Sequence, residues 1–70
     1  MFWWFQRKGE FVRYETRENG RGGYALVVVM PDGTERVEDF PDATSLNERQ
    51  IILERELTAD GWTGPHGWNL

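Results

Sequence analysis

Runs of β-branched and aromatic residues alternate with clusters of turn-forming residues over the first forty positions of the chain. Such runs are typical of β-strands when glycine, proline or asparagine bounds them. The pattern predicts four strands, at residues 2–6, 11–17, 24–30 and 34–40. Between the last two, Pro31-Asp32-Gly33 favours a tight turn, because proline presets φ and glycine accepts the left-handed conformation. These two strands should therefore form an antiparallel hairpin.

A helix is predicted from about Ala43 to Ala59, and its start carries two alternative signals. Ser45 and Glu48 have the spacing of a capping box, whereas Asp42 is an alternative N-cap one turn earlier. Both candidates are short polar side chains that accept a hydrogen bond from the first helical turn.

The predicted end of this helix is more specific. Gly61 suits the left-handed C′ position, which places Trp62 at C″ and Leu57 at C3, the pair that meets in a Schellman cap. The glycine- and proline-containing segment 63–70 is expected to be irregular. Residues 1–62 then form one ββββα domain, and residues 63–70 form a short C-terminal tail.

The helix carries one clear apolar stripe and two isoleucines outside it. At about 100° per residue, Leu46, Leu53 and Leu57 fall on one line, whereas Ile51 and Ile52 lie on opposite flanks of that line. At least one isoleucine should therefore be exposed if the helix packs only against its own sheet. Either the helix tilts so that Ile52 joins the rim of the core, or an isoleucine contacts another chain.

The third predicted strand is apolar on both faces. Its alternation separates Tyr24, Leu26, Val28 and Met30 from Ala25, Val27 and Val29. One helix covers one face of a four-stranded sheet, whereas strands that are apolar on both sides belong to sheets buried on both sides. The second strand alternates apolar and polar residues, so its polar side should continue the uncovered face. Something is therefore expected to cover that second face.

Two sources of cover are consistent with the sequence. The first is a second copy of the chain or another protein, for which the candidate contacts are Val27, Val29, Ile51 and Ile52. The second lies within one chain, where the N-terminal aromatic residues, Trp62 and Trp68 fold over the open face. In that alternative, the two tryptophans are packing residues and not ligand contacts.

The composition favours assembly. The chain has 70 residues and no cysteine, so no disulfide or thiolate metal site can stabilise it. Cores of this size seldom supply more than about 3 to 5 kcal/mol, and oligomerisation is a common supplement. The absence of cysteine also indicates a cytoplasmic protein. The apolar run Met1–Phe5 is too short for a secretory signal or a membrane span.

The net charge of −4 is unevenly distributed. Residues 1–22 carry five basic and three acidic side chains, whereas the remainder carries three basic and nine acidic ones. A basic, aromatic sheet face can bind single strands, because bases stack on the rings while cations neutralise phosphates. The alternative hypothesis is therefore single-stranded nucleic-acid binding through Trp4, Arg13, Arg17 and Tyr24.

The sequence contains no recognisable constellation of reactive residues. His66, the single histidine, stands in the predicted tail without a cysteine or second histidine to share a metal. Ser45 has no histidine or lysine placed to activate it and is explained as a cap. The loop Gly20–Gly23 leads into a strand and not a helix, so it is a hairpin loop and not a phosphate loop. We expect a non-enzymatic domain with no cofactor, no metal and no small-molecule substrate.

The order of elements, four strands and then one helix, resembles in topology the single-stranded-DNA-binding folds of the transcriptional-coactivator and whirly type. That resemblance implies dimerisation, because those folds dimerise through such parts. The segments Tyr24–Val29, Pro31–Glu38 and Ala59–Trp62, together with the predicted helix, are also similar to a set of small bacterial proteins of unassigned function. This second resemblance implies no activity.

The predicted fold is thus α+β, a four-stranded antiparallel meander followed by one C-terminal α-helix and a short irregular tail. The expected function is that of a small interaction domain that homodimerises or docks on a protein partner, away from any membrane. Single-stranded nucleic-acid binding is the alternative.

Overall fold

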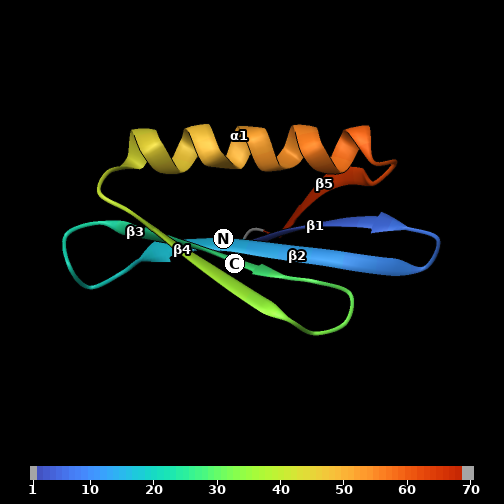
Figure 1. Ribbon diagram of the computed structural model, residues 1–70, viewed down its shortest axis with the longest axis horizontal. Helices are drawn as coiled ribbons and strands as arrows, with labels where there is room; N and C mark the ends of the chain where they lie inside the picture. The colour runs from blue at the N-terminus through green and yellow to red at the C-terminus, as the bar shows by residue number, and fades with distance from the viewer. Residues whose placement is uncertain (1, 69–70) are drawn as a thin grey trace.

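The computed structural model describes residues 2–68 of the chain, apart from the side chain of Trp68. One helix lies across one face of a five-stranded antiparallel sheet, which makes a two-layer α+β fold (Figure 1). In chain order the elements are β1 (Phe2–Arg7), β2 (Glu10–Glu18), β3 (Tyr24–Val29), β4 (Glu35–Phe40), α1 (Ala43–Ala59) and β5 (Thr63–Trp68). Within the sheet the strands follow the order β4-β3-β2-β1-β5.

The four strands expected in the first forty residues are all present, and each predicted bound lies within one residue of the observed one. The predicted β3–β4 hairpin is confirmed. The Met30 backbone N–H donates to the carbonyl of Thr34 at 2.8 Å, and the Gly33 N–H donates to the carbonyl of Met30 at 2.9 Å. The Asp32 carboxylate accepts from the Thr34 N–H at 2.9 Å, which further stabilises the turn.

The ends of α1 follow the predicted capping chemistry. Of the two candidate N-caps, the structure selects Asp42, whose Oδ1 accepts from the Ser45 N–H at 2.8 Å. The Schellman cap at the other end is confirmed. The Trp62 N–H donates to the Leu57 carbonyl at 3.0 Å, and Gly61 adopts a φ of 87°.

The segment expected to be an irregular tail instead forms β5, so the sheet has five strands and not four. Its backbone pairs antiparallel with β1, from Phe2 opposite Trp68 to Gln6 opposite Thr63. The Thr63 hydroxyl also donates to the Gln6 carbonyl at 3.0 Å. Glycine and proline have low strand propensity, so the sequence pattern did not predict this strand, yet both residues are tolerated in an edge strand. The expected tail beyond Trp68 lies outside the described residues.

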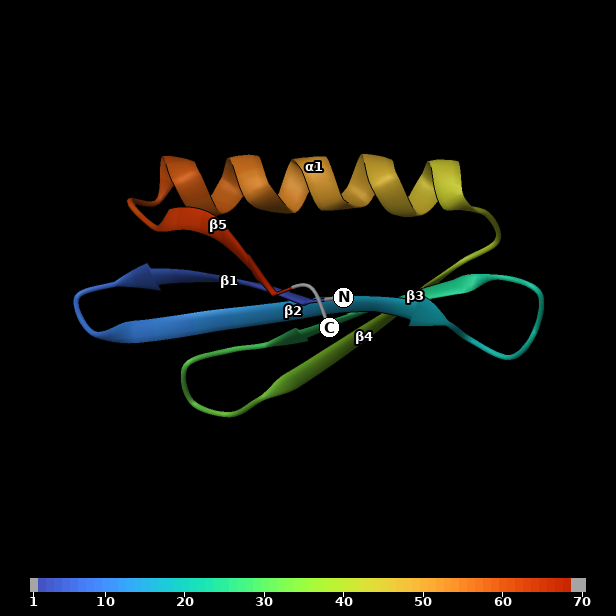
Figure 2. The same cartoon turned by 180° about the vertical axis from the view of Figure 1, so that it is seen from behind.

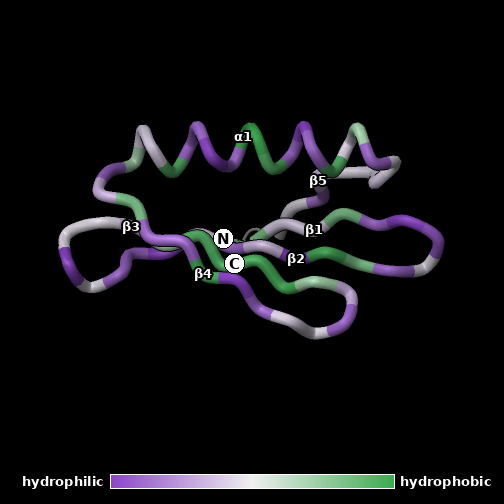
Figure 3. Tube along the Cα trace, in the orientation of Figure 1, coloured by the Kyte–Doolittle hydropathy of each residue, from purple (hydrophilic) through white to green (hydrophobic). Residues whose placement is uncertain are grey.

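The core lies between α1 and one face of the sheet. Its buried residues come from β1, β2, β3, α1 and the turn after the helix: Phe5, Val12, Tyr14, Leu26, Val28, Leu46, Leu53 and Trp62. Hydrophobic positions recur along α1 between hydrophilic ones (Figure 3). The predicted leucine stripe therefore faces the sheet, and the face that receives α1 is the one that bears Leu26 and Val28.

Both isoleucines outside the stripe are exposed, Ile51 by 49% and Ile52 by 47%. The alternative in which the helix tilts so that Ile52 joins the rim of the core is wrong. With Leu46 and Leu53 aimed at the sheet, both flanks of α1 remain in solvent.

Trp62 does not fold over the second face of the sheet. It is 6% exposed and belongs to the core beneath α1. The guanidinium of Arg7 lies 4.5 Å from the centre of its ring and also donates to the Asp60 carboxylate at 2.9 Å. These contacts fasten the turn between α1 and β5 to the end of β1.

The packing of β5 against β1 can be tested with two glycines of the same strand. A Cβ at position 64 would lie 2.9 Å from the Phe5 ring, whereas one at position 67 would lie 3.4 Å from the nearest atom of Trp3. We expect Gly64→Ala to lower the free energy of unfolding by about 2 kcal/mol and Gly67→Ala by less than about 1 kcal/mol. Urea denaturation followed by tryptophan fluorescence measures both. Equal, negligible effects would contradict a packed β5.

Candidate functional site

The face of the sheet opposite α1 is the candidate binding surface, and we call it the open face. Figures 1 and 2 show the helix on one side of the sheet and no element of the described chain on the other. Strand alternation supplies the side chains of this face, because every second residue of each strand points toward it.

The strand register arranges the open face in rows that run across the strands. The Arg13 row contains His66, Trp4, Arg13, Val29 and Glu35. The Val27 row contains Phe2, Glu15, Val27 and Val37. The Arg17 row contains Arg17, Ala25 and Asp39. Phe11 lies opposite Gln6, at the end of the face beyond the Arg13 row.

The apolar side chains at the centre of the open face are buried although no element of the described chain covers them. Ala25 is 4% exposed and Val27 is 3% exposed. The register places Glu15 and Val37 on either side of Val27, and Arg17 and Asp39 on either side of Ala25. The expectation that a partner covers this face stays a prediction, and the side chain of Trp68, the other expected source of cover, lies outside the described residues.

Other apolar side chains of the open face are accessible. Val37 is 56% exposed and Phe11 is 50% exposed, whereas Phe2, Trp4 and Val29 are partly buried. The four candidate contacts named from the sequence therefore do not share one surface. Val29 is accessible on this face, Val27 is buried, and the two isoleucines lie on α1, on the other side of the molecule.

A shallow hollow of about 350 Å³ lies at the centre of the open face. Phe2, Val27 and Val29 provide its apolar lining, and Arg13, Glu15 and Glu35 provide charges. Glu15 lies 3.7 Å from Arg17, whereas within the described residues neither Arg13 nor Glu35 has an ion-pair or hydrogen-bond partner. The hollow therefore combines an apolar surface with one unpaired cation and one unpaired anion.

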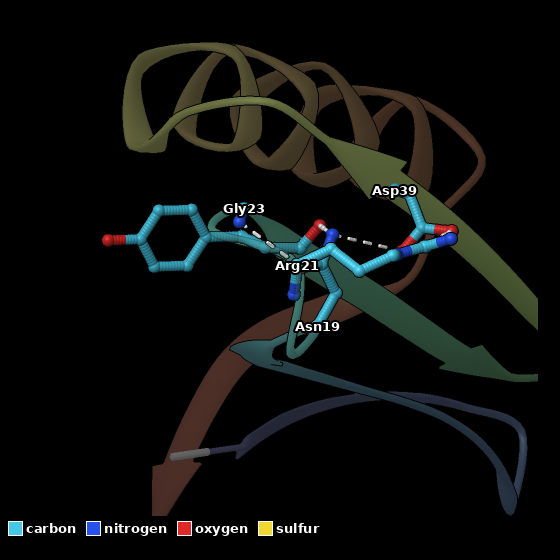
Figure 4. A network of polar contacts seen from close by, with 5 residues as sticks. Asn19, Arg21, Gly23 and Asp39 are labelled. Atoms are coloured by element: carbon cyan, nitrogen blue, oxygen red, sulfur yellow. Dashed lines mark hydrogen bonds and ion pairs between the residues drawn. The ribbon is translucent and has the colours of Figure 1, made fainter.

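The other charges near this face have partners. Arg17 lies 3.7 Å from Glu15, and Arg21 lies 3.0 Å from Asp39. Figure 4 shows the second of these pairs in its network, in which Asn19 accepts from the backbone N–H groups of Arg21 and Gly23 at 2.9 and 3.1 Å. This network connects the β2–β3 loop to β4, so these charges already have partners within the chain.

The residues proposed for nucleic-acid binding do not all meet on one surface. Trp4, Arg13 and Arg17 lie on the open face, and Trp4 is directly opposite Arg13. Tyr24 lies on the other face and packs against the core under α1. The open face bears two arginines against the three acids Glu15, Glu35 and Asp39, so its formal charge is not positive.

His66 lies in β5 and not in a loop. It stands opposite Trp4 in register, and the two rings are 5.4 Å apart. The side chain is exposed. Among the described residues, no group of three or more histidine, cysteine or carboxylate side chains could hold a metal ion.

Sequence reasoning missed Glu35 and Val37, because the alternation of β4 is ambiguous on both faces. The signal that could have found them is the Pro31-Asp32-Gly33 turn. Once that turn sets the register, Glu35 must lie opposite Val29 and Val37 opposite Val27.

Tyr14 has a strongly raised pKa, but it lies on the helix side of the sheet. Burial is the main cause, followed by a 2.6 Å hydrogen bond from its hydroxyl to the Glu54 carboxylate and by the charge of that carboxylate. The rings of Trp3 and Phe5 lie 5.3 and 6.1 Å from its ring. Tyr14 therefore joins the sheet to α1 and takes no part in the open face.

Comparisons of the chain with protein-family models, with curated proteins and with solved structures find no match. No relative therefore suggests a ligand or a reaction for the open face. Among the described residues, no helix is both long enough and apolar enough to cross a membrane. The function has to be argued from the geometry and charge of the open face.

The buried, hydrogen-bonded phenol of Tyr14 makes the free energy of unfolding fall at high pH. The unfolded chain releases the phenol proton near the ordinary pKa of about 10, whereas the folded chain retains it, so folding becomes less favourable as the pH rises above about 10. We expect Tyr14→Phe to lower stability by about 1 kcal/mol at pH 7 and to reduce this alkaline loss. Tyr24→Phe keeps the bond and should retain the loss. Urea midpoints from pH 7 to about pH 11 measure the effect, and identical slopes for all three proteins would contradict it.

Proposed function

We propose that this protein is a small non-enzymatic interaction domain that forms a homodimer through the open face. The observation that carries the proposal is the central hollow, where Arg13 and Glu35 stand unpaired beside the apolar side chains of Phe2 and Val29. A surface that presents an unpaired cation, an unpaired anion and accessible apolar groups is complementary to a second copy of itself. Isologous dimers place the same patch of both copies in contact.

The charge of the open face supports a protein partner over a nucleic acid. Binding to a phosphate backbone depends on an excess of basic side chains, whereas the open face carries more acidic than basic ones. Arg17, one of its two arginines, lies beside Glu15. A self-complementary contact, in contrast, needs both signs on one surface.

The size of the chain supplies a physical reason for dimerisation. A 70-residue chain buries a small core, and an additional interface is one of the few sources of stability when no disulfide can form. Val37 and Phe11, each at least half exposed, are the most exposed apolar residues that an interface on this face would remove from water.

The expected dimer is weak. Four strands about 4.8 Å apart, each contributing about five residues of about 3.3 Å, span roughly 300 Å² in projection. Stable specific interfaces bury about 800 Å² of accessible surface on each partner, so a contact limited to the open face is smaller than these and belongs with weak, transient contacts. We therefore expect a Kd on the order of 10 to 100 µM.

A matched pair of substitutions locates the interface. Val37 on the open face and Ile51 on α1 are β-branched residues of similar exposure, 56% and 49%. We expect Val37→Glu to weaken self-association at least about tenfold, because it places a desolvated charge in the interface, and Ile51→Glu to leave it unchanged. Sedimentation equilibrium from about 5 to about 500 µM, which brackets the expected Kd, measures both variants.

The same experiment separates the alternatives. A wild-type protein that stays monomeric over the whole range would overturn the proposal. Loss of the dimer in Ile51→Glu alone would place the interface on α1. Addition of a single-stranded oligonucleotide tests the alternative function, for which bound mass and salt-sensitive tryptophan quenching are the expected results.

A further inference from the structure

The rows of the open face limit how two copies can pack face to face. In the Arg13 row, Val29 of β3 separates Arg13 on β2 from Glu35 on β4. In the Arg17 row, Ala25 of β3 separates Arg17 from Asp39 in the same way. On this face β3 is therefore an uncharged line. Arg13, Glu15 and Arg17 lie along its β2 side, and Glu35, Val37 and Asp39 lie along its β4 side.

Stacked sheets pack about 10 Å apart with their strands nearly aligned. For a symmetric pair, the twofold axis then lies between the sheets and runs either along the strands or across them. An axis along β3 places β2 of one copy opposite β4 of the other. Each row then faces the same row of the other copy. An axis across the strands keeps β2 opposite β2 and reverses the order of the rows.

These two arrangements have opposite electrostatic consequences. The axis across the strands sets the arginine-bearing strands of the two copies against each other and does the same for the acidic strands. The axis along β3 sets each β2 against β4 of the other copy. In that arrangement Arg13 lies level with Glu35, and Arg17 lies level with Asp39.

An axis along β2 is also unfavourable. It would place Arg13 against Arg13 and Glu15 against Glu15, which are like charges at the centre of the contact. The axis along β3 instead sets Val29 against Val29 and Ala25 against Ala25. Small apolar side chains then meet at the symmetry axis. Each arginine meets an acid of the other copy, and Glu15 lies level with Val37.

Resting on the proposed function, we infer that the two copies pack with their β3 strands facing each other in parallel, so that Arg13 of each copy pairs with Glu35 of the other. These are the two charges of the central hollow that have no partner within the described chain. Arg17 and Asp39 already have neighbours of opposite charge, Glu15 and Arg21. In the dimer, Arg17 of one copy and Asp39 of the other would exchange these neighbours for each other. The Arg13–Glu35 pairs are therefore the specific feature of the dimer.

Charge reversal tests this arrangement. Arg13→Glu and Glu35→Arg each replace two attractive pairs of the symmetric dimer by two repulsive ones. We expect each variant alone to self-associate at least about tenfold more weakly than the wild type. In an equimolar mixture, the mixed dimer restores both pairs, one with its original signs (Arg13 with Glu35) and one with its signs exchanged. The mixture should therefore regain association within about threefold of the wild type, because every Arg13–Glu35 contact again joins opposite charges.

Two matched controls account for net charge. Arg55→Glu and Glu48→Arg make the same charge changes at exposed positions of α1. Neither should alter the Kd of self-association by more than about twofold, alone or mixed. Circular dichroism of each variant confirms that the fold is retained. The doubly reversed chain, Arg13→Glu with Glu35→Arg, should also regain the dimer, which provides a second test if one single variant is poorly folded.

Sedimentation equilibrium of each variant, of the mixture and of the wild type gives distinct outcomes. A wild-type dimer whose single variants do not rescue each other on mixing overturns this arrangement but leaves the open-face dimer standing. Single variants that associate as well as the wild type overturn it too. A monomeric wild type overturns the proposed function and this inference together.

Discussion

The structure depends on one constraint, which is that a single helix can cover only one face of a sheet. The 17 residues of α1 lie across one side of five strands, and all the fully buried large side chains gather there. Tyr14 extends this layer by donating to Glu54 of the helix, and Trp62 closes it at the point where the chain leaves α1. With its only helix used on one side, the described chain has to stabilise the other side of the sheet with the side chains of the strands themselves.

The open face shows which apolar side chains are buried without a covering helix and which are not. Val27 is 3% exposed, and the register places Glu15 and Val37 beside it. In the neighbouring row Val29 is only partly buried, and Arg13 and Glu35 have no partner in the described chain. The same surface therefore combines buried apolar residues with unpaired charges, and the proposed dimer uses the unpaired charges.

The prediction from sequence was most accurate where local chemistry is sufficient. The turn Pro31-Asp32-Gly33 and the cap at Gly61 each need only a few neighbouring residues to form, and both are present as expected. The prediction failed for β5, because a strand of glycine, proline and histidine has low intrinsic propensity and exists through pairing with β1. It was also incomplete for the site, since β4 carries charged residues on both faces and its orientation follows from pairing with β3.

The sequence by itself determined the elements of the first 62 residues, the leucine stripe of the helix and the presence of a strand with two apolar faces. Only the tertiary structure decided that Leu26 and Val28 meet the helix, that Val27 is buried, and that Arg13 and Glu35 flank one hollow. The reason is physical. Turns, caps and periodicity are set by interactions over a few residues, whereas a sheet face is assembled from strands distant in sequence, and its register determines which charges and apolar groups become neighbours.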